Sequence, residues 1–184
     1  IYTDTKVTGV KEVKGGLEVS MEGAALKDDE KAQTFERVLV SIGRRPNGAV
    51  PGLDKTRVKV PERGFIEVDQ RLRTAEPNIF AIGDVAGKQL LAHLASHMGI
   101  VAAENAMGHT VKMDYRAVPG PIYTVPEVAM VGLSEEQARE QGYDVITGRF
   151  PFRPLGRAMA LNEREGLVKI VAERKYGEVL GVHI

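Results

Sequence analysis

The sequence predicts an α/β protein whose 184 residues fall into three blocks. The central observation is a short apolar run, then Gly83-Asp84, then apolar residues at helical spacing, which is the order strand, loop, helix. Apolar and polar residues alternate in segments before and after this region, a pattern typical of antiparallel strands. The chain has neither an internal repeat nor a low-complexity tract, so a mixed α/β fold is the prediction.

The first block predicts a hairpin that leads into a buried strand. Apolar and polar residues alternate over Lys6–Val13 and Leu17–Met21, and Gly15-Gly16 between them suits a tight turn. A polar connection follows at Lys27–Lys31. The run Val38–Ile42 lacks alternation and ends at a glycine, as expected of a strand that is covered on both faces.

The second block predicts a strand and a helix. Gly43–Gly48 breaks both periodicities, and we place a domain crossing there. Ile79–Ile82 predicts a second buried strand that stops at the Gly-Asp pair. Gly108 suits the end of the helix, because glycine readily adopts the left-handed conformation found there. One apolar stripe predicts the helix: Leu90, Leu91, Leu94, Met98, Val101 and Ala102.

The third block begins at the Pro- and Gly-rich residues 118–121 and predicts an antiparallel sheet with one short helix. Ser134 and Gln137 have the spacing of a capping box, so a helix is expected from there to the region of Gly142. A Lys-Tyr-Gly turn separates the last two strands. The predicted strands are Glu127–Val131, Tyr143–Phe150, Gly166–Ala172 and Glu178–Ile184.

Composition excludes several classes of function. The 25 Lys and Arg residues balance 25 Asp and Glu residues, so no broad basic face is available to bind nucleic acid. The longest weakly polar run, residues 90–107, contains His and Glu, so no membrane-spanning helix is predicted. The absence of cysteine excludes disulfides, thiolate zinc sites and a thiol nucleophile within these residues, and no other metal site is predicted. The chain begins with Ile, and we expect this start to be a cut.

The Gly-Asp pair carries the clearest chemistry. Ligands of open parallel sheets bind beyond the carboxyl ends of the strands, and Asp84 occupies such an end. Gly83 lets a ligand approach the backbone, and the Asp84 carboxylate can accept hydrogen bonds from ribose or ribitol hydroxyls. The free amides of the following helix favour a negatively charged ligand. A sugar-containing cofactor therefore fits; the alternative is an ordinary turn followed by a packed helix.

The length of the matching motifs favours the cofactor. Residues 74–85 (TAEPNIFAIGDV), 90–93 (LLAH) and 40–47 (VSIGRRPN) resemble the second half of the pyridine nucleotide-disulfide oxidoreductases. Within that family, residues 123–132 (YTVPEVAMVG), with residues 166–170 and 180–184, look most like the dihydrolipoamide dehydrogenase branch. The resemblance covers nearly the whole chain. Residues 154–156 depart from the family pattern, which leaves the contacts there open.

The resemblance implies pieces of three domains. Residues 1–46 would be the end of an NAD-binding domain, and residues 47–117 the C-terminal part of a doubly wound FAD-binding domain. Residues 118–184 would be the start of an α+β dimerisation domain. The implied cofactors are FAD and NAD. In the family reaction a disulfide oxidises dihydrolipoamide, the electrons pass through FAD, and a hydride leaves to NAD+.

The resemblance also implies which residues bind the cofactors. Asp84, next to Gly83, would hold the ribityl chain of FAD, and Gly43 would lie near bound NAD. The start of the helix would offer backbone groups to the pyrimidine end of the flavin. The residues concerned there are Leu90, Leu91, Ala92 and His93.

No catalytic residue is predicted in this chain. It contains no Gly-x-Gly-x-x-Gly loop for a dinucleotide phosphate and no redox cysteine, and we expect the family's catalytic His-Glu pair to lie beyond it. The four histidines are expected to be structural or cofactor-side residues. Arg44 and Arg45 are either nucleotide-phosphate ligands or solvated or ion-paired residues at a domain boundary.

We therefore expect part of a cytoplasmic, homodimeric flavoprotein that serves the lipoyl-bearing subunits of 2-oxoacid dehydrogenase or glycine-cleavage complexes. The chain alone is expected to be inactive. Two alternatives stay open. One is another flavoprotein disulfide reductase, of the mercuric or glutathione reductase type. The other is a non-catalytic dimerisation module, because an unfinished sheet leaves an edge that seeks a partner strand.

Overall fold

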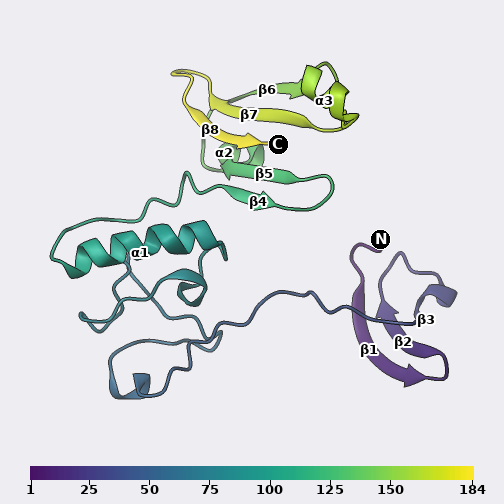
Figure 1. Cartoon of the computed structure of the whole chain (residues 1–184), viewed down its shortest axis with the longest axis horizontal. Helices are drawn as coiled ribbons and strands as arrows, with labels where there is room; N and C mark the ends of the chain where they lie inside the picture. The colour runs from purple at the N-terminus through teal and green to yellow at the C-terminus, as the bar shows by residue number, and fades with distance from the viewer. The chain divides into compact units, whose positions relative to one another are not determined.

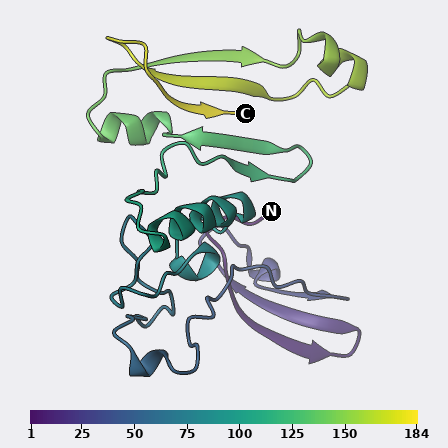
Figure 2. The same cartoon turned by 60° about the vertical axis from the view of Figure 1, so that its left-hand side comes forward.

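The computed structural model describes residues 1–184, and the chain divides into two compact units, Ile1–Arg44 and Arg45–Ile184 (Figure 1; Figure 2). Each unit contains one antiparallel sheet, and the second unit also contains the longest helix. None of the helices is both long enough and apolar enough to span a membrane.

The first unit is a three-stranded meander, and it confirms the predicted hairpin. Strands β1 (Lys6–Val13), β2 (Gly16–Glu22) and β3 (Ala32–Phe35) pair in that order, all antiparallel. The 3-10 turn η1 (Asp28–Glu30) lies in the polar connection. Strand β3 was not predicted, since its four residues show no apolar alternation. A small apolar cluster forms the core of the unit: Val19, Met21 and Leu26, with Val38 packed against them.

The predicted buried strand at Val38–Ile42 is wrong. The segment forms no strand, and the side chains of Leu39 and Ile42 are 91% and 94% exposed. A strand that is covered on both faces needs neighbouring strands to satisfy its backbone groups, and no strand of this chain pairs with the segment. The segment is apolar, but apolar composition alone does not supply a neighbouring strand to pair with.

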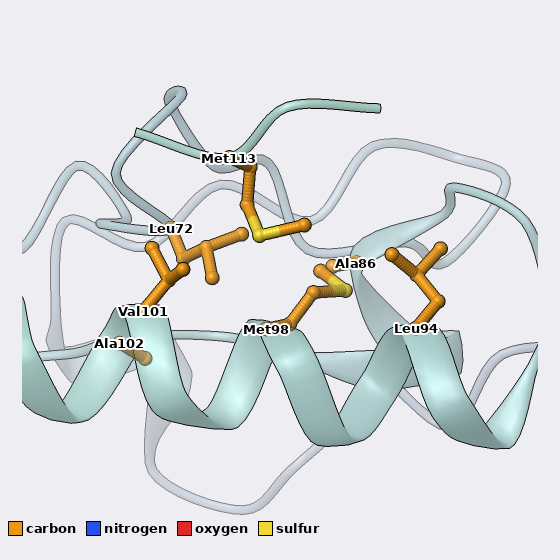
Figure 3. Close-up of a cluster of buried hydrophobic side chains, with 7 residues drawn as sticks. All are labelled: Leu72, Ala86, Leu94, Met98, Val101, Ala102 and Met113. Carbon is orange, nitrogen blue, oxygen red and sulfur yellow. The ribbon is translucent and has the colours of Figure 1, made fainter. Parts of the chain in front are cut away.

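In the second unit, helix α1 (Ala92–Ala106) collects the largest core of the chain (Figure 3). The predicted helix is confirmed, with its start two residues later than the stripe suggested. Gly108 ends it with a φ of +95°, as predicted. Figure 3 shows α1 side chains facing side chains from the segments around it. The buried members of this cluster are Leu72, Ala86, Leu94, Met98, Val101, Ala102 and Met113.

The second predicted buried strand, Ile79–Ile82, is reduced to an irregular hairpin. One isolated bridge joins Arg73 to Phe80, and the Ala81 amide donates to the Leu72 carbonyl at 3.2 Å. Ala81 is buried, but no regular strand lies on either side of the segment to extend the ladder. The 3-10 turn η2 (Leu53–Lys55) precedes this region.

The third block folds into a five-stranded antiparallel sheet with the order β4-β5-β8-β7-β6. Four of its strands match the predictions within two residues at each end; β4 and helix α3 (Gly156–Leu161) were not predicted, because each is short and begins next to a proline or glycine. The strands are β4 (Gly120–Ile122), β5 (Val128–Gly132), β6 (Val145–Pro151), β7 (Leu167–Glu173) and β8 (Val179–His183).

Helix α2 (Glu135–Glu140) covers one face of this sheet. The capping box is confirmed: the Gln137 amide donates to the Ser134 hydroxyl at 3.1 Å, and the Ser134 amide donates to the Gln137 side chain at 3.0 Å. Ala138 of the helix packs against Val145 and Val171 of the sheet, which are both buried.

Candidate functional site

The Gly-Asp pair lies in a tight 3-10 turn, η3 (Gly83–Ala86), that packs against α1. Gly83 has a φ of +69°, and a Cβ added to it would lie 3.3 Å from the Cβ of Ala95 on the helix. Glycine therefore serves two purposes here, the left-handed conformation and the close approach of the turn to the helix. The Gly87 amide donates to the Asp84 carbonyl at 3.2 Å and closes the turn.

Asp84 is an exposed residue of this turn. Its side chain is the acidic group of η3, and a carboxylate can accept several hydrogen bonds from ligand hydroxyls. Ala86 packs the turn against the helix, because it is buried beside Leu94 and Met98 of α1 (Figure 3). The backbone that carries Asp84 is thus fixed to the helix, while the residue itself is exposed.

The N-terminus of α1 is uncapped. The residue at the N-cap position is Leu91, whose side chain has no acceptor, and no side-chain cap is formed. Ala95 is the first residue whose amide donates along the helix, to the Leu91 carbonyl at 3.0 Å. The amides of Ala92, His93 and Leu94 therefore have no protein acceptor, and the helix dipole adds partial positive charge at this end. Ala92 and His93 are exposed, so a ligand oxygen can reach this end.

The structure brings most of the predicted site residues onto two packed elements. Gly83 and Asp84 lie on η3, and Ala92 and His93 lie in the first turn of α1. Leu90 is exposed in the segment between them, whereas Leu91 packs partly against the α1 core. The seventh residue, Gly43, is an exposed residue of the first unit with a φ of +117°.

The histidines have no carboxylate partners. Nε2 of His93 lies 2.7 Å from the Pro119 carbonyl oxygen, and Nε2 of His183 lies 3.0 Å from the Leu133 carbonyl oxygen. His97 and His109 are exposed, and the side chain of neither forms a hydrogen bond or ion pair. No group of three His, Cys, Asp or Glu residues is arranged to hold a metal ion. General acid-base catalysis by a histidine needs a positioned partner, and these four histidines show none.

A hollow beside the turn was not foreseen from the sequence. It has a volume of about 420 Å³. The ring of Phe65 fills the space that a side chain at Gly87 would need. Nζ of Lys88 lies 5.5 Å above the ring of Tyr115, and burial raises the pKa of the Tyr115 hydroxyl. No sequence motif signals this hollow, which is lined by Pro61, Arg63, Phe65, Ile66, Glu67, Val68, Ala86, Gly87 and Lys88.

The chain matches two models of known protein families. Residues 1–107 match the family model described as pyridine nucleotide-disulphide oxidoreductase, and residues 118–184 match the dimerisation domain of that family. The chain belongs to the pyridine nucleotide-disulphide oxidoreductase family. The family resemblance of the Gly-Asp and Leu-Ala-His motifs is thereby confirmed.

Individual family members are similar over the whole chain. All 184 residues align with the dihydrolipoyl dehydrogenases of Thermus scotoductus, at 46% identity, and Geobacillus stearothermophilus, at 42% identity. The enzyme of the same name from Bacillus subtilis is 39% identical over the same length. The aligned region covers 40%, 38% and 38% of these relatives, so the chain spans about two fifths of their length.

Two solved structures of similar proteins share the fold. LpdA from Mycobacterium tuberculosis matches with a TM-score of 0.86 and 28% identity, over 97% of this chain and 38% of LpdA. The HOCl-induced flavoprotein disulfide reductase RclA from Escherichia coli matches with a TM-score of 0.83 and 26% identity, over 97% of this chain and 40% of RclA. The predicted α/β fold class is confirmed.

Proposed function

We propose that this chain is part of a dihydrolipoyl dehydrogenase that uses FAD and NAD+. The observation that carries the proposal is the uncapped N-terminus of α1 packed beside the Gly83-Asp84 turn. The names of the curated relatives support the branch, since the aligned enzymes from three bacteria are all dihydrolipoyl dehydrogenases.

The residues of the turn and helix fit a flavin dinucleotide. Ribityl hydroxyls need acceptors, and the Asp84 carboxylate supplies them on an exposed turn. The carbonyl oxygens and the N1 region of a flavin need donors, and the first-turn amides of Ala92 and His93 are available for them. Gly83 adds no side chain on the approach. Gly43 is proposed to lie near bound NAD.

The proposed role of these residues is to bind and orient the cofactor. FAD, when bound, supplies electron transfer between a disulfide and a pyridine nucleotide. The positive end of the α1 dipole would stabilise negative charge on the ligand, and Asp84 would fix its position along the ribityl chain. The 184 residues include no cysteine, so thiol-disulfide exchange requires residues other than these. We therefore propose that the chain by itself is inactive.

The domain boundaries and partners are part of the same proposal. Residues 1–46, 47–117 and 118–184 are assigned to the NAD-binding, FAD-binding and dimerisation domains. The match of residues 118–184 to a dimerisation domain supports a homodimer. The lipoyl-bearing subunits of 2-oxoacid dehydrogenase or glycine-cleavage complexes are proposed as partners, and the cytoplasm as the location.

A segment exchange tests the proposal. The 184 residues replace the aligned segment of the Thermus scotoductus enzyme, to which they are 46% identical. The chimaera should retain one flavin per chain after desalting and oxidise dihydrolipoamide with NAD+. Asp84→Ala should weaken FAD binding by about 10- to 100-fold, the loss expected when hydrogen bonds to a charged group are removed. Asp54→Ala is the matched control, because Asp54 is an exposed aspartate in η2.

The outcomes distinguish loss of FAD binding from loss of folding. A folded chimaera that binds no flavin, or equal FAD affinity in the Asp84 and Asp54 variants, would overturn the assignment of this site. The unmodified 184-residue chain provides a second test. Mixed with FAD and desalted, it should lose its yellow colour, because it contains no Gly-x-Gly-x-x-Gly phosphate loop. Retention of stoichiometric flavin would contradict the proposal that tight FAD binding needs a phosphate loop outside these 184 residues.

A further inference from the structure

The side chain of His93 spans a junction in the second unit. Its Nε2 lies 2.7 Å from the carbonyl oxygen of Pro119, a residue 26 positions further along the chain. His93 is the second residue of α1, and Pro119 directly precedes β4. Val118 packs partly against the α1 core, so the chain is already close to the helix at this point.

The chemistry of this hydrogen bond fixes the state of the imidazole. A carbonyl oxygen only accepts, so Nε2 must carry the hydrogen and donate it. The neutral ring is then the Nε2-H tautomer, and Nδ1 is unprotonated. Pro119 has no amide hydrogen, so its carbonyl is the only backbone polar group with which the residue can be held.

Because His93 lies in the first turn of α1, its hydrogen bond to Pro119 restrains that turn. The backbone amide of His93 is one of the first-turn donors that lack a protein acceptor, and its side chain is anchored at the start of the third block. The first turn of a helix frays most readily when it is uncapped. An anchor on the second residue restrains the turn without occupying its amides.

We propose that His93 is a positioning residue whose side chain latches the first turn of α1 to Pro119 and thereby holds the first-turn amides in place for a ligand. The inference rests on the proposed function for the identity of that ligand, but the latch itself is a property of the chain alone. His97, one turn further along the same helix, is exposed and its side chain forms no hydrogen bond, which makes it the matched comparison.

Nuclear magnetic resonance of the isotopically labelled 184-residue chain, without flavin, tests the latch. Imidazole nitrogen shifts measured near pH 8 should identify the Nε2-H tautomer at His93. Exchange of the Ala95 amide hydrogen, the first donor along α1, should be about fivefold to tenfold faster in His93→Leu, as expected for the loss of one hydrogen bond. His93→Gln retains an amide donor and should restore the slow rate, and His97→Leu should leave it unchanged.

Two results would overturn the latch. One is the Nδ1-H tautomer at His93 in the unmodified chain, a measurement that needs no variant to fold. The other is equal Ala95 exchange in His93→Leu and His97→Leu. Because no flavin is present, either failure leaves the FAD proposal standing. A chimaera that fails to bind FAD would equally leave the tautomer and exchange results intact.

Discussion

Asn105 is the only fully buried amide side chain in the α1 core, and its replacement by leucine should be severely destabilising. The residue is 1% exposed. Its Nδ2 donates to the carbonyls of Val111 at 2.8 Å, Val101 at 2.9 Å and Arg71 at 3.2 Å, and its Oδ1 accepts from the Val111 amide at 3.0 Å. The side chain therefore joins the last turn of the helix to two segments that run beside it.

The magnitude follows from the groups that would be left without partners. Leucine has the same number and branching of side-chain heavy atoms but no polar atoms, so Asn105→Leu would leave the Val111 amide and carbonyl and the Arg71 carbonyl without partners. A buried backbone group without a partner costs about 1–3 kcal/mol, and the lower end applies because these partners are only partly buried. Three such groups predict a loss of roughly 3 kcal/mol in the free energy of unfolding.

Urea unfolding followed by circular dichroism at the helix band measures this loss. The signal is suitable because α1 is the longest helix, and the chain contains no tryptophan for fluorescence. Asn78→Leu is the control: Asn78 is exposed in the same unit, and its replacement should change stability by no more than about 0.5 kcal/mol. A loss below about 1 kcal/mol for Asn105→Leu would refute the idea that this amide connects the three segments.

Two further changes test the turn and the third block. Gly83→Ala should destabilise the fold by about 1–2 kcal/mol, because Gly83 has a positive φ and lies against an alanine of α1. Gly99→Ala, in mid-helix with room for a methyl group, should stabilise the fold by about 0.5–1 kcal/mol in the same urea assay. Changes of the same sign in the two variants would contradict the role given to Gly83 in the turn. The hydrogen bond from Lys169, with a second from Arg139, lowers the pKa of Glu135 from 4.5 to about 2. The ionised carboxylate thus stabilises the folded chain fully above pH 4.5, and this contribution is lost as the pH falls toward 2. The urea midpoint should fall less steeply over that range in Glu135→Gln, and parallel curves for the two proteins would refute the link.

Local patterns were sufficient for the elements that carry their own signals. Helix α1 was predicted from an apolar stripe along it and a glycine just beyond its end, and α2 because Ser134 and Gln137 form a capping box within four residues. The hairpin of β1 and β2 followed from alternation around two glycines. In each case the signal that predicts the element lies in residues close in sequence, so the sequence contains the evidence directly.

Partners far apart in sequence account for the elements that were missed or wrongly predicted. Strand β3 has no apolar alternation and exists because it pairs with β2, from Leu17 opposite Phe35 to Ser20 opposite Ala32. The run Val38–Ile42 has strong strand character but no pairing partner in the chain, so it forms none. The hydrogen bonds of Asn105 to Arg71 and of His93 to Pro119 likewise depend on tertiary structure, and no spacing rule predicts them.

The presence or absence of packing partners within the chain also explains why the proposed flavin-binding residues are held in place while no parallel sheet forms. The turn that carries Asp84 is held by Ala86 against Leu94 and Met98, and all of these side chains are buried within the chain itself. The exposed Leu39 and Ile42 find no such cover. The half of the proposed site made by η3 and α1 is therefore organised before any ligand arrives, which would reduce the entropy that binding must overcome. A segment exchange into a relative should accordingly transfer this half of the site as a formed unit, and the His93 latch would be present before FAD is added.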